Sequence, residues 1–114
     1  MPTEFRFLVF TPTEAARALL SFAQTRQMEV PRGAVLKAEP VDGEPPKARL
    51  YVRPDQGEDQ SLDFETAEVV AALIGDCIKR GVPLPRESEK ALEQLHGRLA
   101  PRIGMGGKLK DEEE

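Results

Sequence analysis

The chain has 114 residues, of which 39% are hydrophobic and 32% are charged. This length suits one domain with a modest core and is too short for two conventional domains. The net charge is -4, and the last four residues carry all of it, so residues 1–110 balance 16 basic against 16 acidic side chains (20 minus 4). A domain with no net charge does not attract nucleic acid or an anionic membrane over long range. Binding to either of them would therefore require a local patch of basic residues.

The cysteine count and the first residues of the chain indicate the cellular compartment. A lone cysteine, Cys77, excludes an intrachain disulfide and a cysteine-rich zinc site. The first ten residues have no basic n-region, and their apolar run is too short to cross a bilayer. We therefore expect a cytoplasmic protein with no disulfide and no membrane contact.

The segment EFRFLVF, residues 4–10, predicts a strand because it is rich in aromatic and β-branched residues. A helix follows, because Thr11 and Glu14 match a capping box and Pro12 suits the first helical position. Alanine and leucine recur at helical spacing from Ala15 to Ala23, so this helix is expected to cover a sheet.

Residues 34–41 and 47–53 predict a hairpin with the five-residue loop DGEPP. Pro40 would have to lie near a strand end or on an edge strand. The second segment, KARLYVR, alternates cleanly, with one set of side chains facing the core and the other facing water. The inward set is Ala48, Leu50 and Val52, and the outward set is Lys47, Arg49, Tyr51 and Arg53.

A short strand at residues 61–64 is expected to point Leu62 and Phe64 inward. The next helix, from about Glu65 to Arg80, has acidic residues in its first turn, basic residues in its last turn and Gly81 as its stop. Its apolar face is expected to consist of Val70, Leu73, Ile74, Cys77 and Ile78.

Residues 86–97 are strong helix formers and predict a third helix. The alternative is a turn-linked pair of strands around His96 and Gly97. Together these elements predict an α+β fold in which a small, largely antiparallel sheet of three to four strands carries two to three helices on one face, in the order β-α-β-β-(β)-α-α. We expect a single domain over residues 1–103 and a disordered charged tail over residues 104–114.

Candidate reactive groups are few. Cys77 is expected to be a buried, inert thiol, and His96 a solvated histidine at a helix end. The acidic cluster Asp55, Glu58, Asp59 and Asp63 does not have EF-hand spacing, and no hydrolase, redox or nucleotide-binding motif is present. We expect no cofactor, no metal site and no catalytic residues.

The outward side of KARLYVR is the one surface for which the sequence suggests a binding function. Lys47, Arg49 and Arg53 lie beside Tyr51, and Arg6 would join them if its strand were a neighbour. Basic side chains around an aromatic ring suit an anionic ligand, although an exposed strand face carries such residues for solubility as well.

Three hypotheses of function follow. The first is a non-catalytic, regulatory module that binds a protein partner, favoured because catalytic constellations are missing. The second is a binder of RNA or single-stranded nucleic acid that uses the basic strand face. The third, and the weakest, is a small enzyme that uses carboxylates such as Asp55, Asp59 and Asp63.

Overall fold

Two helices and two three-stranded antiparallel sheets make up residues 4–84 and 90–105, the part of the chain that the computed structural model describes. The elements in chain order are β1 (Glu4–Phe7), α1 (Pro12–Thr25), β2 (Gly33–Val41), β3 (Lys47–Pro54), β4 (Gln60–Phe64), α2 (Thr66–Lys79), β5 (Lys90–Leu95) and β6 (Arg98–Met105). Sheet A has the order β1-β6-β5, and sheet B has the order β2-β3-β4. The expected α+β class is confirmed, but the strands form two sheets instead of one.

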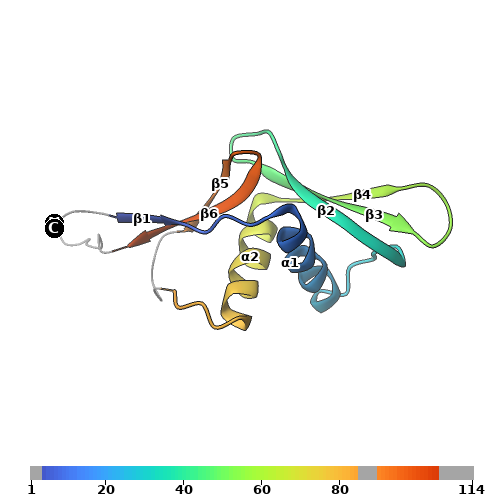
Figure 1. Cartoon of the computed structure of the whole chain (residues 1–114), viewed down its shortest axis with the longest axis horizontal. Helices are drawn as coiled ribbons and strands as arrows, with labels where there is room; N and C mark the ends of the chain where they lie inside the picture. The colour runs from blue at the N-terminus through green and yellow to red at the C-terminus, as the bar shows by residue number, and fades with distance from the viewer. Residues whose placement is uncertain (1–3, 85–89, 106–114) are drawn as a thin grey trace.

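Both helices lie on the same side of the strands (Figure 1), and the core fills the space between them. Leu19 of α1 and Leu73 of α2 meet Leu50 and Phe64 of sheet B, and Leu99 brings sheet A into the same cluster. All five side chains are at most 1% exposed. Burial of this apolar surface is the main force that holds the two sheets and the helices together.

The start of α1 is the capping box that the sequence predicts. The Thr11 hydroxyl accepts a bond from the Glu14 N–H at 3.1 Å, and the Thr11 N–H donates to the Glu14 carboxylate at 2.9 Å. These bonds satisfy two donors at the helix start and set where the chain leaves the strand before it. The buried face of α1 is made mostly of small side chains, so the helix lies close to its neighbours: Ala15, Ala16, Ala18, Leu19 and Ala23.

Sheet B confirms the predicted hairpin and the predicted fourth strand. β2 and β3 are joined by residues 42–46, and Pro40 lies on β2, which is an edge strand. Ala48, Leu50 and Val52 are buried, so β3 alternates as expected. Phe64 of β4 is fully buried opposite Ala48.

α2 is also confirmed, but its buried face differs from the expected one and consists of Val69, Ala72, Leu73 and Cys77. The chain leaves the helix at Gly81, which has the left-handed φ of 77° that glycine adopts easily. Leu73 and Cys77 are buried one turn apart, but Ile78 is 66% exposed, so its prediction as a core residue is wrong. The next position along a helix is turned by about 100°, which carries Ile78 away from the Leu73–Cys77 stripe.

The predicted third helix is wrong, and the alternative pair of strands is what forms. β5 and β6 make a hairpin whose two turn residues, His96 and Gly97, have φ values of 53° and 73°. Two positive φ values match the tight turn whose twist suits two antiparallel strands. Residues 85–89 and 106–114 lie outside the described residues, and β6 runs through Met105, two residues into the expected tail.

Sheet A contains a proline in its central strand. Leu8 donates its N–H to the Pro101 carbonyl at 3.1 Å, and Phe10 donates to the Leu99 carbonyl at 2.9 Å, so the chain follows β6 beyond the end of β1. Pro101 has no N–H and therefore cannot donate a second hydrogen bond back to the Leu8 carbonyl. The regular β1–β6 ladder is interrupted after Phe7 for this reason. Leu8 and Phe10 face the core, while Phe7 and Val9 face outward and are 43% and 46% exposed.

Candidate functional site

The β3 outer face consists of Lys47, Arg49, Tyr51 and Arg53, the four residues that the sequence places on one side of this strand. Strand alternation puts them opposite the buried residues of β3, and all four are at least partly exposed. The prediction that these four share one surface is confirmed. What the sequence does not reveal is which neighbours they meet.

Both arginines of the β3 outer face bind carboxylates. Arg49 donates to Asp63 through Nε at 2.7 Å and through Nη2 at 3.3 Å, because the two residues are directly opposite in the β3–β4 ladder. Arg53 donates to Asp59 through Nε at 3.1 Å and through Nη2 at 3.4 Å. Each guanidinium therefore already makes the two-pronged contact that it would otherwise offer to a phosphate.

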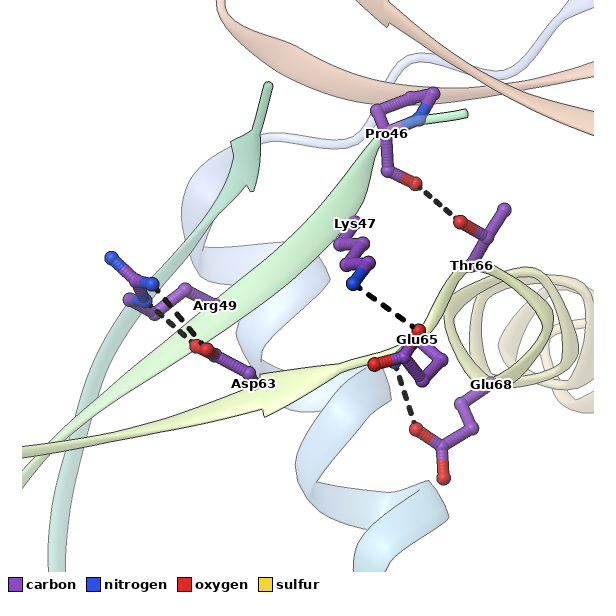
Figure 2. A network of polar contacts seen from close by, with 7 residues as sticks. All are labelled: Pro46, Lys47, Arg49, Asp63, Glu65, Thr66 and Glu68. Carbon is purple, nitrogen blue, oxygen red and sulfur yellow. Dashed lines mark hydrogen bonds and ion pairs between the residues drawn. The ribbon is translucent and has the colours of Figure 1, made fainter. Parts of the chain in front are cut away.

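The remaining two residues of the face also have acidic partners. The Lys47 ammonium lies 3.4 Å from the Glu65 carboxylate, and Figure 2 shows this pair beside the start of α2. The Tyr51 hydroxyl donates to Glu39 at 3.2 Å, and Lys37 lies 5.3 Å from the centre of the tyrosine ring. The face is thus an array of alternating charges and not a basic patch.

Arg6 does not join this array. Its strand, β1, belongs to sheet A, whereas β3 belongs to sheet B. The Arg6 guanidinium instead donates to the Pro83 carbonyl at 3.3 Å, in the segment that follows α2. The anionic-ligand surface suggested by the sequence therefore loses one of its five members.

The ion pair between Arg49 and Asp63 on the β3 outer face shifts the pKa values of both groups. The hydrogen bonds from Arg49 hold the pKa of Asp63 below its usual value, and the same contacts raise the pKa of Arg49. A carboxylate with a depressed pKa stays ionised and suits neither the role of a general acid nor that of a proton shuttle near neutral pH.

We expect Arg49→Gln to raise the pKa of Asp63 toward its ordinary value, because the charged hydrogen-bond donor is removed. The Asp63 pKa is lower in the folded state, so its contribution to stability is present above the unfolded pKa and is lost as pH falls through the folded pKa. A carbon-detected NMR titration of the Asp63 carboxyl measures the shift directly. The matched control is Arg53→Gln, which leaves Arg49 in place, and an equal shift of Asp63 in both variants would contradict the assignment.

The other candidate reactive groups are separate from this face. Cys77 is buried on α2, and burial raises the pKa of its thiol, which keeps it in the inert form. His96 is exposed, as expected, but it lies in the β5–β6 turn, so its predicted place at a helix end is wrong. Within residues 4–84 and 90–105, no group of three His, Cys, Asp or Glu side chains is placed to hold a metal ion.

A second surface, which the sequence does not reveal, is an open groove of about 720 Å³ between three elements. One wall is the β2–β3 loop at Glu44, Pro45 and Pro46, and the other wall is β5. The floor is the first half of α2. The Thr66 hydroxyl donates to the Pro46 carbonyl at 2.7 Å, which fixes the loop wall against the start of the helix (Figure 2). The floor residues are Thr66, Ala67, Val70 and Ala71, and the β5 wall is residues 90–93.

The β5 wall carries backbone groups that are not used by sheet A. The Pro101 carbonyl accepts a bond from β1, so the alternation of the ladder directs Ala100 and Arg102 toward β5, where they pair with Glu93 and Ala91. The N–H and C=O of Leu92, between those two pairs, therefore point away from β6. β5 is an edge strand, and its edge borders the groove.

Comparisons with protein-family models, with curated proteins and with solved structures find no match for this chain. Among the described residues, neither helix is long and apolar enough to span a membrane. Any functional assignment therefore has to come from the two surfaces described above.

Proposed function

We propose that this protein is a non-catalytic, cytoplasmic module that binds an extended peptide segment of another protein in the groove beside β5. The observation that carries the proposal is the edge of β5, where the N–H and C=O of Leu92 point away from β6 and border a groove with an apolar floor. An extended peptide can add to such an edge as a further strand, so that backbone hydrogen bonds supply affinity and alternate side chains supply specificity.

The lining of the groove defines the chemistry of the peptide. Ala67, Val70 and Ala71 offer a shallow apolar floor that suits apolar side chains at alternate positions of a strand. Glu44 is exposed at the rim and forms no ion pair with any residue in the described part of the chain, so a basic side chain beside the apolar ones is favoured. The volume lies in the range of about 300–1,000 Å³ that is typical of ligand pockets.

The arrangement of charges counts against the nucleic-acid hypothesis. A strand of RNA would have to break the Arg49–Asp63 and Arg53–Asp59 pairs and bring its phosphates close to two carboxylates. Counterion release favours binding only where cations exceed anions at the surface. The carboxylate-enzyme hypothesis has the same weakness, because Asp59 and Asp63 each have an arginine partner.

Selection of a phage-displayed random peptide library on the full chain tests the proposal. Selected peptides are expected to contain alternating apolar residues and a basic residue. Titration of one such peptide into isotope-labelled protein should shift the Leu92 amide signal and slow its hydrogen exchange. Selected peptides whose shifts fall on Arg49 and Arg53 instead, or failure to select any peptide, would contradict the proposal.

The double variant Ala67→Glu/Ala71→Lys fills the groove floor without touching the core. Both alanines are exposed on α2, and Glu and Lys four residues apart favour a helix. We expect this variant to fold normally and to bind the selected peptide at least about tenfold more weakly, a difference of about 1.4 kcal/mol. The control Thr13→Glu/Arg17→Lys places the same pair at exposed positions of α1 and should leave the affinity unchanged.

A further inference from the structure

The loop between β2 and β3, residues 42–46, contains the one peptide bond in the chain that joins an aspartate to a glycine, Asp42–Gly43. Both residues are exposed. At this end of the loop, Oδ1 of Asp42 accepts a hydrogen bond from Nε2 of Gln94 on β5 at 3.2 Å. At the other end, the Thr66 hydroxyl donates to the Pro46 carbonyl at 2.7 Å. A side-chain hydrogen bond therefore fixes each end of the loop to a neighbouring element.

The shape of the loop favours a glycine directly after Asp42. A Cβ atom at position 43 would lie 3.0 Å from the carbonyl oxygen of Pro45, which is closer than an ordinary van der Waals contact. The Gly43 N–H donates no hydrogen bond to any other described residue. Because Gly43 has no side chain and its N–H has no partner, its nitrogen is accessible to the carboxyl group of Asp42.

We propose that Asp42 is a site of spontaneous modification, at which aspartate isomerises to isoaspartate through a succinimide ring. The Gly43 nitrogen forms a bond to Cγ of Asp42, a ring closure favoured by the proximity of the two groups within one chain. The Gly43 amide proton and a hydroxyl group of the protonated carboxyl leave together as one water molecule. The reaction needs no oxidant, reductant or enzyme.

Hydrolysis of the ring completes the reaction. Water adds to the original backbone carbonyl carbon of Asp42, and the bond from that carbon to the Gly43 nitrogen breaks. The main chain then runs through Cγ, and the original backbone carbonyl becomes a free carboxylate. Addition of water to the Cγ carbonyl regenerates aspartate instead. The water lost in ring closure is regained in hydrolysis, so the product has the composition of the original chain.

Isomerisation changes the link between the loop and β5. In isoaspartate the main chain is one carbon atom longer, and the carboxylate is attached directly to Cα. The Gln94 amide therefore loses its acceptor, and the loop is released from β5 at this end, while the Thr66–Pro46 bond remains. The loop is also one wall of the groove beside β5, so any effect on peptide binding rests on the proposed function, whereas the modification does not.

Incubation of the full chain in water enriched in the heavy isotope of oxygen tests the modification. Each passage through the ring incorporates the isotope, and mass spectrometry of proteolytic fragments locates it. We expect labelling at Asp42, together with an isoaspartate form that electron-transfer fragmentation distinguishes from aspartate. The exposed residues Asp55, Asp59 and Asp63 are internal controls, because each precedes a residue with a side chain. Their labelling should be at least about tenfold slower, since that side chain hinders ring closure.

Two reference samples keep the test decisive. Asp42→Glu retains a carboxylate but would have to close a larger ring, so labelling at position 42 should be lost. A synthetic peptide of residues 40–46 gives the rate without the fold. Isomerisation of the peptide with no change in the folded chain over the same period would overturn the proposal, because the fold would then protect the bond. Equal labelling of Asp42 and Asp55 would also overturn it.

NMR of the separated isomerised chain tests the release of the loop. The Gln94 side-chain amide signals should move toward those of a solvated glutamine, and the Glu44 amide should shift as it does in Gln94→Ala, which removes the same bond. The Leu92 amide, on the same strand, should keep its position. Unchanged Gln94 signals would contradict the release. Neither measurement uses a peptide ligand, so failure of the proposed peptide binding would leave both results intact.

Discussion

Replacing Phe64 by alanine is expected to lower the free energy of unfolding by about 3 to 5 kcal/mol. The Phe64 side chain is fully buried, and its ring meets the Phe22 ring edge to face with a centroid separation of 6.5 Å. Truncation leaves a cavity between β4 and α1 that the surrounding backbone cannot close, because β4 is hydrogen-bonded to β3 and leads directly into α2. A loss of this size is a large part of the total stability of a small domain.

Equilibrium unfolding in urea measures this effect. Phe64→Leu keeps most of the volume and is expected to cost less than about 1.5 kcal/mol, so it remains measurable if the alanine variant is too unstable to study. Ile78→Ala is the matched control, because Ile78 is 66% exposed and its truncation should change stability by no more than about 0.5 kcal/mol. Equal losses for Phe64→Ala and Ile78→Ala would mean that the core does not lie where the structure has it.

Gly33→Ala is expected to destabilise the fold by about 1 to 3 kcal/mol, for a different reason. A Cβ atom at this position would overlap the carbonyl oxygen of Arg53 and lie 2.6 Å from the Cα atom of Pro54. Both obstacles are backbone atoms of β3 and cannot rotate away as a side chain would. The first residue of β2 would therefore have to move out of the hairpin.

The same substitution at Gly75 serves as the control and should have the opposite sign. Gly75 lies within α2, and a Cβ atom there meets nothing within 4 Å. Alanine favours a helix over glycine by about 0.8 to 1 kcal/mol, so Gly75→Ala should stabilise the protein. Urea unfolding of the two variants side by side tests the close approach at Gly33, and a neutral result for Gly33→Ala would contradict it.

The sequence predicts the first two thirds of the fold well because local signals and tertiary packing agree there. Thr11 and Glu14 define the start of α1 through a bond pattern confined to four residues. The alternation of KARLYVR matches a strand with one buried face. In both segments the local preference and the final environment favour the same structure, which is typical of elements that can be predicted from sequence.

The prediction fails at residues 90–95 because local and tertiary preferences conflict there. KALEQL consists of helix formers, yet these residues pair with β6 as β5. Pro101 adds to the difficulty, because proline is rarely found in a central strand. The signal that favours the correct alternative is the pair His96-Gly97, which can adopt the two positive φ values of a tight hairpin turn.

The candidate surfaces depend on contacts between distant segments, which the sequence does not specify. The position of Arg49 on the outer side of β3 follows from alternation alone. Its partner Asp63 is fourteen residues away, and the bond forms only because of the register between β3 and β4. The groove is even harder to predict from the sequence, because it is lined by a loop, a helix and a strand that was expected to be a helix.

The pairing of β1 with β6 has a consequence for the order in which the chain folds during its synthesis. β1 is made before the other elements described here, but its partner strand ends at Met105, and Glu4 lies directly opposite that residue. Sheet B and both helices lie between these two strands in the chain, so all of their residues leave the ribosome before β6 does. The apolar run from Phe7 to Phe10 must therefore remain without its strand partner until β6 has been synthesised.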